Sequence, residues 1–204
     1  YNTRTNKIDN IKRINYKEPY EISQRKIISN MDIFMPQICV GFKFFPVCGD
    51  EIIKRGILAD IVADMYFSKS SDFFQREYEK GILNDRVGVS YEAEDSFGHV
   101  IFSAESLYLE KLEKDLINYI LEIKKEDIDV ELFENIKNNK IGGLILSSDN
   151  ISNSYRRIID SILTETNPYD DIEILKNINV GDLKNFLNNF GENNMVVSIT
   201  QNKQ

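Results

Sequence analysis

The order of apolar and polar residues predicts strands and helices that follow one another without a regular repeat. From 37 to 44 every second residue is apolar, which is the period of a strand with one buried face. From 52 to 65 apolar residues recur every three or four positions, which predicts a helix packed on a core. The same two periods predict helices at 72–80, 107–124, 130–147, 151–163 and 181–190, and strands at 87–91, 100–104 and 195–200. This order predicts an α+β fold, in which helices cover one face of a largely antiparallel sheet.

Polar residues mark several helix ends. The Ser71 hydroxyl can cap the free amides of the helix at 72–80, and Gly81 can adopt the left-handed conformation that ends it. Asn179 is followed three residues later by Asp182, which is the pattern of a capping box. These signals fix where two of the helices begin.

Two adjacent glycines, Gly142 and Gly143, interrupt the helical pattern of 130–147. A glycine inside a helix costs roughly 1 kcal/mol relative to alanine. We therefore interpret the pair as a site where another backbone packs closely.

Composition narrows the function classes. The 204 residues are 42% apolar, enough for one large domain, and carry a net charge of −8 with a pI near 4.9. Phosphate backbones and anionic lipids would repel such a surface, so nucleic-acid binding is disfavoured. No run approaches the ~20 apolar residues of a membrane helix. The cysteines, Cys39 and Cys48, have neither disulfide nor metal-ligand spacing, and we expect free thiols and a cytoplasmic location.

No catalytic constellation is visible. His99 is the only histidine, so a zinc site built from paired histidines on a helix is impossible within this chain. No glycine-rich loop has phosphate-binding spacing, and the carboxylates cluster in polar turns or at helix starts. The serines lack a strained elbow and a base other than His99.

Four segments, taken in order, carry a family resemblance. A small-residue turn opens the helix at 70–82 and a Lys-Gly-Ile stop ends it, a polar turn follows at 94–98, a helix pair spans 133–151, and a helix starts at 179–183. Together they resemble the C-terminal, non-zinc half of the bacterial M16 (insulinase- or pitrilysin-like) zinc metallopeptidases. The likeness covers most of the chain from Glu18 to Thr200.

The resemblance implies a half of LuxS/M16 metallopeptidase-like fold, of which two close around a peptide substrate. In this family the first half carries an inverted His-x-x-Glu-His zinc motif, which is absent here. The resemblance therefore implies zinc in an upstream half of the same polypeptide and none in this chain. We expect 1–17 to be the start of a fragment or a linker and 18–204 to be the M16-type domain, and pairing with a like or unlike chain stays open.

Many members place an Arg and a Tyr of the second half at the peptide cleft. By resemblance the Arg position is occupied by Tyr78, and the Tyr position falls at Asn84 or Asp85, depending on a one-residue gap. Arg76 or Arg86 could substitute in charge, although a solvated or structural arginine is the favoured interpretation. These five residues are the substrate-binding candidates, and none is assigned a catalytic role. An edge strand can also bind an extended peptide through its backbone alone.

Three hypotheses remain. The chain is the substrate-enclosing half of an active zinc endopeptidase, or a non-catalytic partner subunit or peptide-binding module without an active zinc half, or an interaction domain that shares only the fold. A His-x-x-Glu-His motif in the preceding ~200 residues would favour the first hypothesis. Alone, the chain is predicted to hold no stoichiometric zinc and to be inactive.

Overall fold

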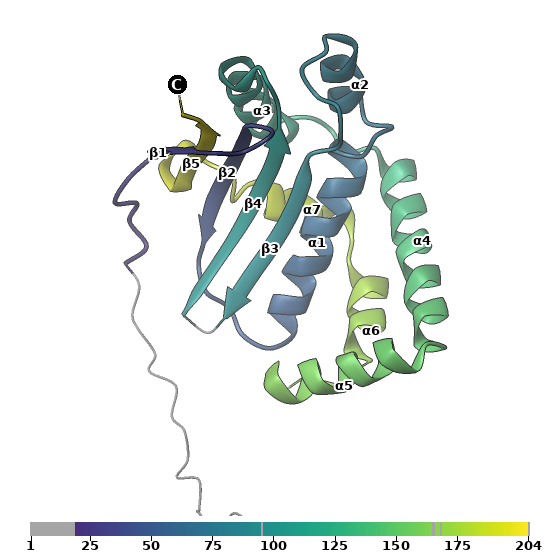
Figure 1. The fold of residues 1–204 in the computed structure, drawn as a ribbon. Coiled ribbons are helices and arrows are strands. Elements are labelled where there is room, and N and C mark those ends of the chain that lie inside the picture. Colours follow the sequence, from purple (N-terminus) through teal and green to yellow (C-terminus); the bar gives the residue numbers. More distant parts are fainter. Residues whose placement is uncertain (1–18, 95, 165, 168, 204) are drawn as a thin grey trace, which may run out of the picture.

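The computed structural model describes residues 19–94, 96–164, 166–167 and 169–203, and Figure 1 shows their arrangement. Within these residues five strands form one sheet in the order β1-β5-β2-β4-β3. β1 runs parallel to β5, and the other neighbouring pairs are antiparallel. The elements are β1 (Lys26–Met31), β2 (Gln37–Phe44), α1 (Asp50–Tyr66), α2 (Asp72–Glu79), β3 (Gly88–Glu94), β4 (Phe97–Glu105), α3 (Leu109–Ile123), α4 (Val130–Ser148), α5 (Ile151–Thr164), α6 (Asp170–Asn177), α7 (Val180–Leu187), a short 3-10 turn (Glu192–Asn194) and β5 (Met195–Asn202). The predicted α+β fold is confirmed.

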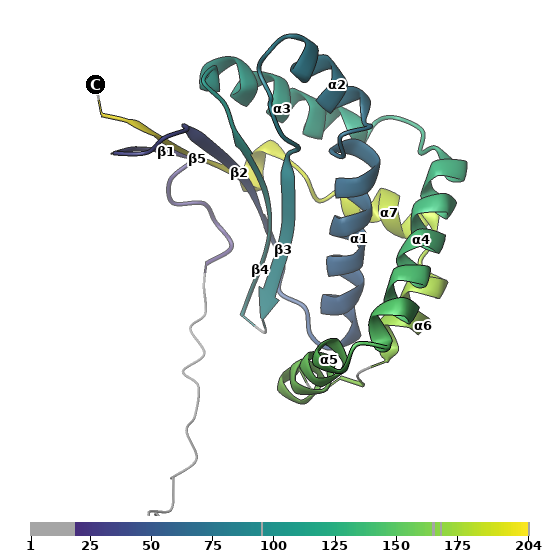
Figure 2. The same cartoon turned by 45° about the vertical axis from the view of Figure 1, so that its right-hand side comes forward.

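Helices cover one face of the sheet, and the opposite face of the central strands carries none of them (Figure 2). The alternation of β2 explains this division, because Ile38, Val40 and Phe42 are fully buried while the residues between them are only half-buried. On β4 the buried residues Val100 and Phe102 pair with Phe42 and Val40, so they turn to the same side. The other side is an open sheet face.

The core between the sheet and the helices is built largely from phenylalanine and aliphatic residues. The rings of Phe42, Phe102 and Phe190 lie 5.0–5.9 Å apart, centroid to centroid. The two long helices against the sheet contribute Leu58, Ile61, Val62 and Met65 from α1, and Leu112, Leu116 and Ile120 from α3. Each fully buried side chain of this size stabilises the fold by about 1.5–3 kcal/mol.

The predicted helix ends are confirmed. The Ser71 hydroxyl accepts the Phe74 amide at 3.3 Å, and Gly81, with φ of 69°, follows the end of α2. At α7 the Asn179 side chain accepts the Asp182 amide and the Asp182 carboxylate accepts the Asn179 amide, at 3.2 and 3.0 Å. Each capping side chain therefore satisfies one of the free amides at the start of its helix.

Some elements differ from the sequence prediction. β1 was not predicted, since its residues do not alternate in burial and its place is set by backbone pairing with β5. α6 was not predicted either; it buries a single side chain, Leu175. The close packing predicted at Gly142 and Gly143 is wrong, because a Cβ at either position would meet no atom within 4 Å. The segment 1–17 lies outside the described residues, and its assignment stays a prediction.

Candidate functional site

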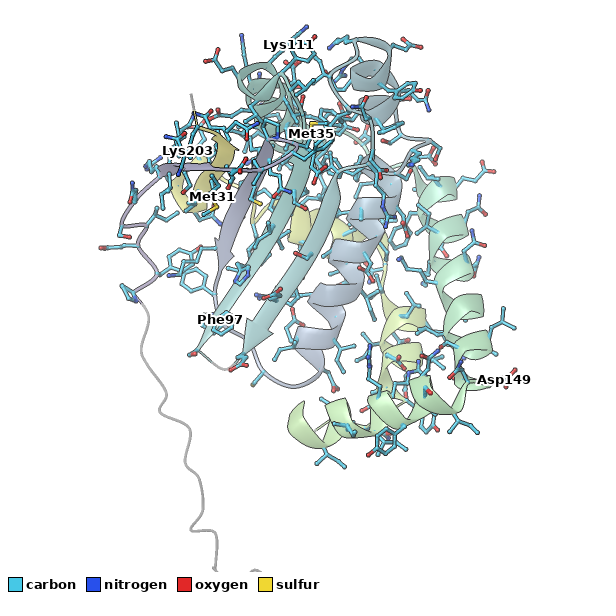
Figure 3. All side chains as sticks on the ribbon, in the orientation of Figure 1. Met31, Met35, Phe97, Lys111, Asp149 and Lys203 are labelled. Atoms are coloured by element: carbon cyan, nitrogen blue, oxygen red, sulfur yellow. The ribbon has the colours of Figure 1, made fainter. Side chains whose placement is uncertain are left out.

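A cavity of about 440 Å³ lies on the open sheet face, where β2 and β3 begin and β4 ends. Met35, labelled in Figure 3, lies at this end of the sheet. The lining residues are Met35, Gln37, Ile38, Cys39, Asn84, Asp85, Arg86, Gly88, Ser103, Ala104 and Glu105. Residues from three strands and two loops therefore meet here.

Small residues on adjacent strands line the sheet side of the cavity. Cys39 and Gly88 are both register partners of Ser103, on either side of β4. A Cβ added at Gly88 would lie 2.7 Å from the Ser103 Oγ, so glycine leaves room for that hydroxyl. Burial raises the pKa of the Cys39 thiol, which keeps the sulfur protonated near neutral pH and makes it a poor nucleophile.

The wall of the cavity is the loop segment 84–86, which follows α2. The amides of Ile82 and Leu83 both donate to the Glu77 carbonyl oxygen, at 2.9 and 3.2 Å, and both side chains are buried. These contacts anchor the loop immediately before its polar residues. The structure thus brings three of the five sequence-predicted candidates, Asn84, Asp85 and Arg86, to one cavity.

The charged groups at the cavity differ in how they are compensated. Asp85 lies 2.9 Å from the Lys69 Nζ, and this hydrogen bond, with that from the Arg86 amide, holds the pKa of the Asp85 carboxyl below its usual value. Glu105 accepts a hydrogen bond from the Gln37 amide at 2.9 Å. The exposed Arg86 guanidinium makes no hydrogen bond within the described residues, so its donors are available to a ligand.

The other two candidates lie on α2, outside the cavity lining. The Arg76 Nε donates to Glu77 at 2.9 Å, and its guanidinium lies 5.5 and 5.7 Å from the ring centroids of Phe73 and Tyr119. This is the arrangement of a structural arginine. The Tyr78 ring stacks on Phe74 and is 56% exposed.

Sequence reasoning missed the strand residues of the cavity and the buried carboxylate of Glu77. Gln37 and Cys39 alternate with the apolar residues of β2, which was the available signal that they face the open side. Glu77 is fully buried although charged. Its position four residues after the buried Phe73 was the available signal, because such residues share one helix face.

His99 lies on the open sheet face rather than in a metal site. Its Nε2 is 3.7 Å from the Glu92 carboxylate, and its ring stacks on Phe97. Within the described residues no three His, Cys, Asp or Glu side chains gather as metal ligands. None of the described helices combines the length and the apolar character needed to cross a bilayer.

Comparison with known proteins shows which proteins share this architecture. No family profile matches the sequence. The chain is 25% identical over 183 residues to the uncharacterised zinc protease YmfH of Bacillus subtilis (strain 168), covering 87% of this chain and 42% of that protein. An M16-like peptidase from Alicyclobacillus acidocaldarius superposes with a TM-score of 0.84 at 20% identity, over 92% of this chain and 46% of that chain. The chain has the fold of an M16-type peptidase half.

A third similar structure consists of one domain of about the same extent as this chain. The inactive peptidase domain of a zinc protease from Bordetella parapertussis superposes with a TM-score of 0.69 at 10% identity, over 86% of this chain and 96% of that domain. By contrast, this M16-type half spans less than half the length of YmfH and of the Alicyclobacillus protein. Those relatives therefore hold a further region of similar size.

Proposed function

We propose that this M16-type half is the non-catalytic, C-terminal half of a zinc metallopeptidase, and that its open sheet face and cavity bind the peptide that a zinc-bearing half upstream hydrolyses. The observation that carries the proposal is the cavity at 84–86. Its wall includes the two positions, Asn84 and Asp85, where the family resemblance puts a substrate-contacting residue. The adjacent Arg86 adds a cation to the same wall.

The residues of this half supply binding and orientation. The Arg86 guanidinium presents several donors that can hold the carbonyl or carboxylate oxygens of a peptide, and the Asn84 amide can both donate and accept. Among the strands that the structure describes, the edge strands β1 and β3 each have one hydrogen-bonded neighbour, and an added peptide strand needs only backbone groups. A peptide added at β3, where Gly88 lines the cavity, would be held in extended form along that edge and beside the cavity.

Zinc belongs to the other half in this proposal. When bound there, the metal would activate the attacking water. The side chains of this chain do not fit such a site, because the inverted motif needs two histidines and the whole sequence has His99 alone. This half therefore acts by holding and enclosing the substrate.

Peptide binding by the chain tests the proposal directly. The titration uses an unstructured fluorescent peptide library and follows fluorescence anisotropy. Arg86→Gln should weaken binding about tenfold, the effect of losing one charge-assisted hydrogen bond. The matched control is Arg156→Gln on α5, an arginine that is also exposed but lies outside the cavity lining, which should leave the affinity unchanged. Equal affinities of wild type and Arg86→Gln would refute the proposal that this cavity binds the peptide.

Metal analysis tests the division of labour between the halves. The isolated chain should contain no stoichiometric zinc and should not cleave peptides. A longer polypeptide with a His-x-x-Glu-His half should bind zinc and cleave peptides. One tightly bound zinc per isolated chain would refute the non-catalytic assignment.

The free thiols of Cys39 and Cys48 suit the reducing cytoplasm, which we propose as the location.

A second candidate function is a non-catalytic partner subunit or peptide-binding module without any active zinc half. The Bordetella parapertussis structure favours this candidate, because that domain is of similar extent and is described as inactive. The two functions differ in one observable property of the complete protein. Zinc-dependent peptidase activity supports the first, and peptide binding without cleavage supports the second.

A further inference from the structure

A buried serine, Ser106, follows the last residue of β4 and makes three hydrogen bonds. The residue is 1% exposed. Its hydroxyl donates to the Ile82 carbonyl oxygen at 2.6 Å and accepts the Tyr108 amide at 3.0 Å. Its own amide donates to the Pro36 carbonyl oxygen at 3.0 Å. One residue thus joins the loop before β2 and the loop after α2 to the end of β4.

Two of the joined segments form the β2 and β4 side of the cavity. Pro36 lies between Met35 and Gln37, which both line the cavity, and the lining residue Glu105 directly precedes Ser106. Gln37 and Glu105 are register partners and also share a side-chain hydrogen bond of 2.9 Å. The bond from the Ser106 amide therefore continues the pairing of β2 with β4 beyond the end of both strands.

The third segment leads into the wall at 84–86. The three wall residues are exposed, whereas Leu83 before them and Val87 after them are 0% and 2% exposed. Within the described residues no donor other than the Ser106 hydroxyl bonds to the Ile82 carbonyl oxygen. A buried carbonyl without a donor is costly, so this bond fixes the backbone just before the wall begins.

We propose that Ser106 is a positioning residue of the cavity, whose hydroxyl holds the wall at 84–86 where Arg86 can reach the peptide. The inference rests on the proposed function, because it assigns a role in the same site. Ser106 is buried and is not among the lining residues, so it acts through the wall without touching the peptide. A hydroxyl suits this role because it donates and accepts at once, to the Ile82 carbonyl oxygen and from the Tyr108 amide.

The peptide affinity of Ser106→Ala tests the inference, in the same fluorescence anisotropy titration as Arg86→Gln. The affinity should fall about fivefold, the effect of losing the order that one neutral hydrogen bond supplies. The matched control is Ser161→Ala on α5, which removes another buried hydroxyl that donates to a carbonyl oxygen, away from the cavity, and should bind like the wild type. The titrations are run where circular dichroism shows every variant folded, so that a loss of global stability alone does not change the affinity.

The double variant Ser106→Ala/Arg86→Gln separates positioning from a merely structural role. If the hydroxyl acts by placing Arg86, its loss has little effect once the guanidinium is gone, and the double variant should bind within about twofold of Arg86→Gln. Multiplied losses in the double variant, or wild-type affinity of Ser106→Ala, would overturn the inference and leave the proposed function standing. If Arg86→Gln binds as tightly as the wild type, the function proposed for the cavity fails and this inference fails with it.

Hydrogen exchange of the wild-type chain tests the same link without a variant, and so decides the matter even if Ser106→Ala does not fold. Saturating peptide should slow exchange of the Leu83, Ser106 and Tyr108 amides together, because a bound peptide orders the wall and the wall is tied to Ser106. Unchanged exchange of the Ser106 and Tyr108 amides with saturating peptide would overturn the inference.

Discussion

Replacing Glu77 by glutamine should destabilise the protein by about 2 kcal/mol at neutral pH. The fully buried Glu77 carboxylate accepts from the Arg76 Nε at 2.9 Å and the Lys80 Nζ at 2.8 Å, and its second oxygen has no hydrogen-bond partner among the described residues. A charge-assisted hydrogen bond contributes about 1.5–3 kcal/mol and a neutral one about 0.5–1.5. Two such bonds therefore lose about 2 kcal/mol in total when the acceptor becomes an amide.

The pH dependence shows whether charge is the cause. Burial alone would raise the pKa of Glu77, but the hydrogen bonds and charges of Lys80 and Arg76 outweigh it and hold the pKa below the usual 4.5. Stability from the ionised carboxylate is then fully present above pH 4.5 and is lost as the pH falls through the lowered pKa of the folded state. Acid should therefore reduce the difference between wild type and Glu77→Gln.

Urea denaturation and thermal unfolding, both followed by circular dichroism, measure these effects. At neutral pH the melting temperature of Glu77→Gln should fall by about 4–8 °C. The matched control is Glu79→Gln, an exposed glutamate on the same helix, which should change stability by less than about 0.5 kcal/mol. A loss at Glu77→Gln that stays the same from neutral pH into acid would refute the electrostatic reasoning and point to packing.

Two further predictions concern a helix start and the thiols. Asn179→Ala removes the side-chain half of the α7 capping box, and thermal or urea unfolding should show a loss of about 1 kcal/mol. Asn188→Ala, at the exposed C-cap position of α7 where the backbone amide rather than the side chain bonds to the helix, should cost less than about 0.5 kcal/mol. With iodoacetamide at mildly alkaline pH the exposed Cys48 should be alkylated before Cys39, whose thiol pKa is raised by burial. The Cys48→Ser and Cys39→Ser variants, each with one remaining cysteine, give the two alkylation rates separately. Equal rates for Cys39 and Cys48 in the folded protein and in these variants would contradict this order.

The sequence predicted the elements whose side chains pack on the core. β2 and α1 have clear periods because one face of each is buried, and Ser71, Gly81 and Asn179 act within a few residues of their own positions. β1 escaped prediction because backbone pairing with a distant strand, not its side chains, places it in the sheet. Gly142 and Gly143 show that a glycine pair need not mark close packing.

The candidate site was predicted only where family resemblance named positions. The resemblance put one family position at Asn84 or Asp85, and the neighbouring Arg86 was named as a residue that could substitute in charge. Gln37, Ser103 and Glu105 join them from strands that are far apart in the sequence, and this meeting depends on the register of β2 and β4. Register is a tertiary property that alternation of residues alone does not fix.

The position of β5 constrains how this protein can be made. β5 lies between β1 and β2, so these two strands, which are synthesised first, do not pair with each other, and β1 joins the sheet only through β5. The ribosome must therefore synthesise the chain through β5, which ends at Asn202, before the sheet can close. Pairings of such large sequence separation slow folding. Until then β2 exposes an unpaired edge, and a nascent chain halted before Met195 would be prone to aggregation.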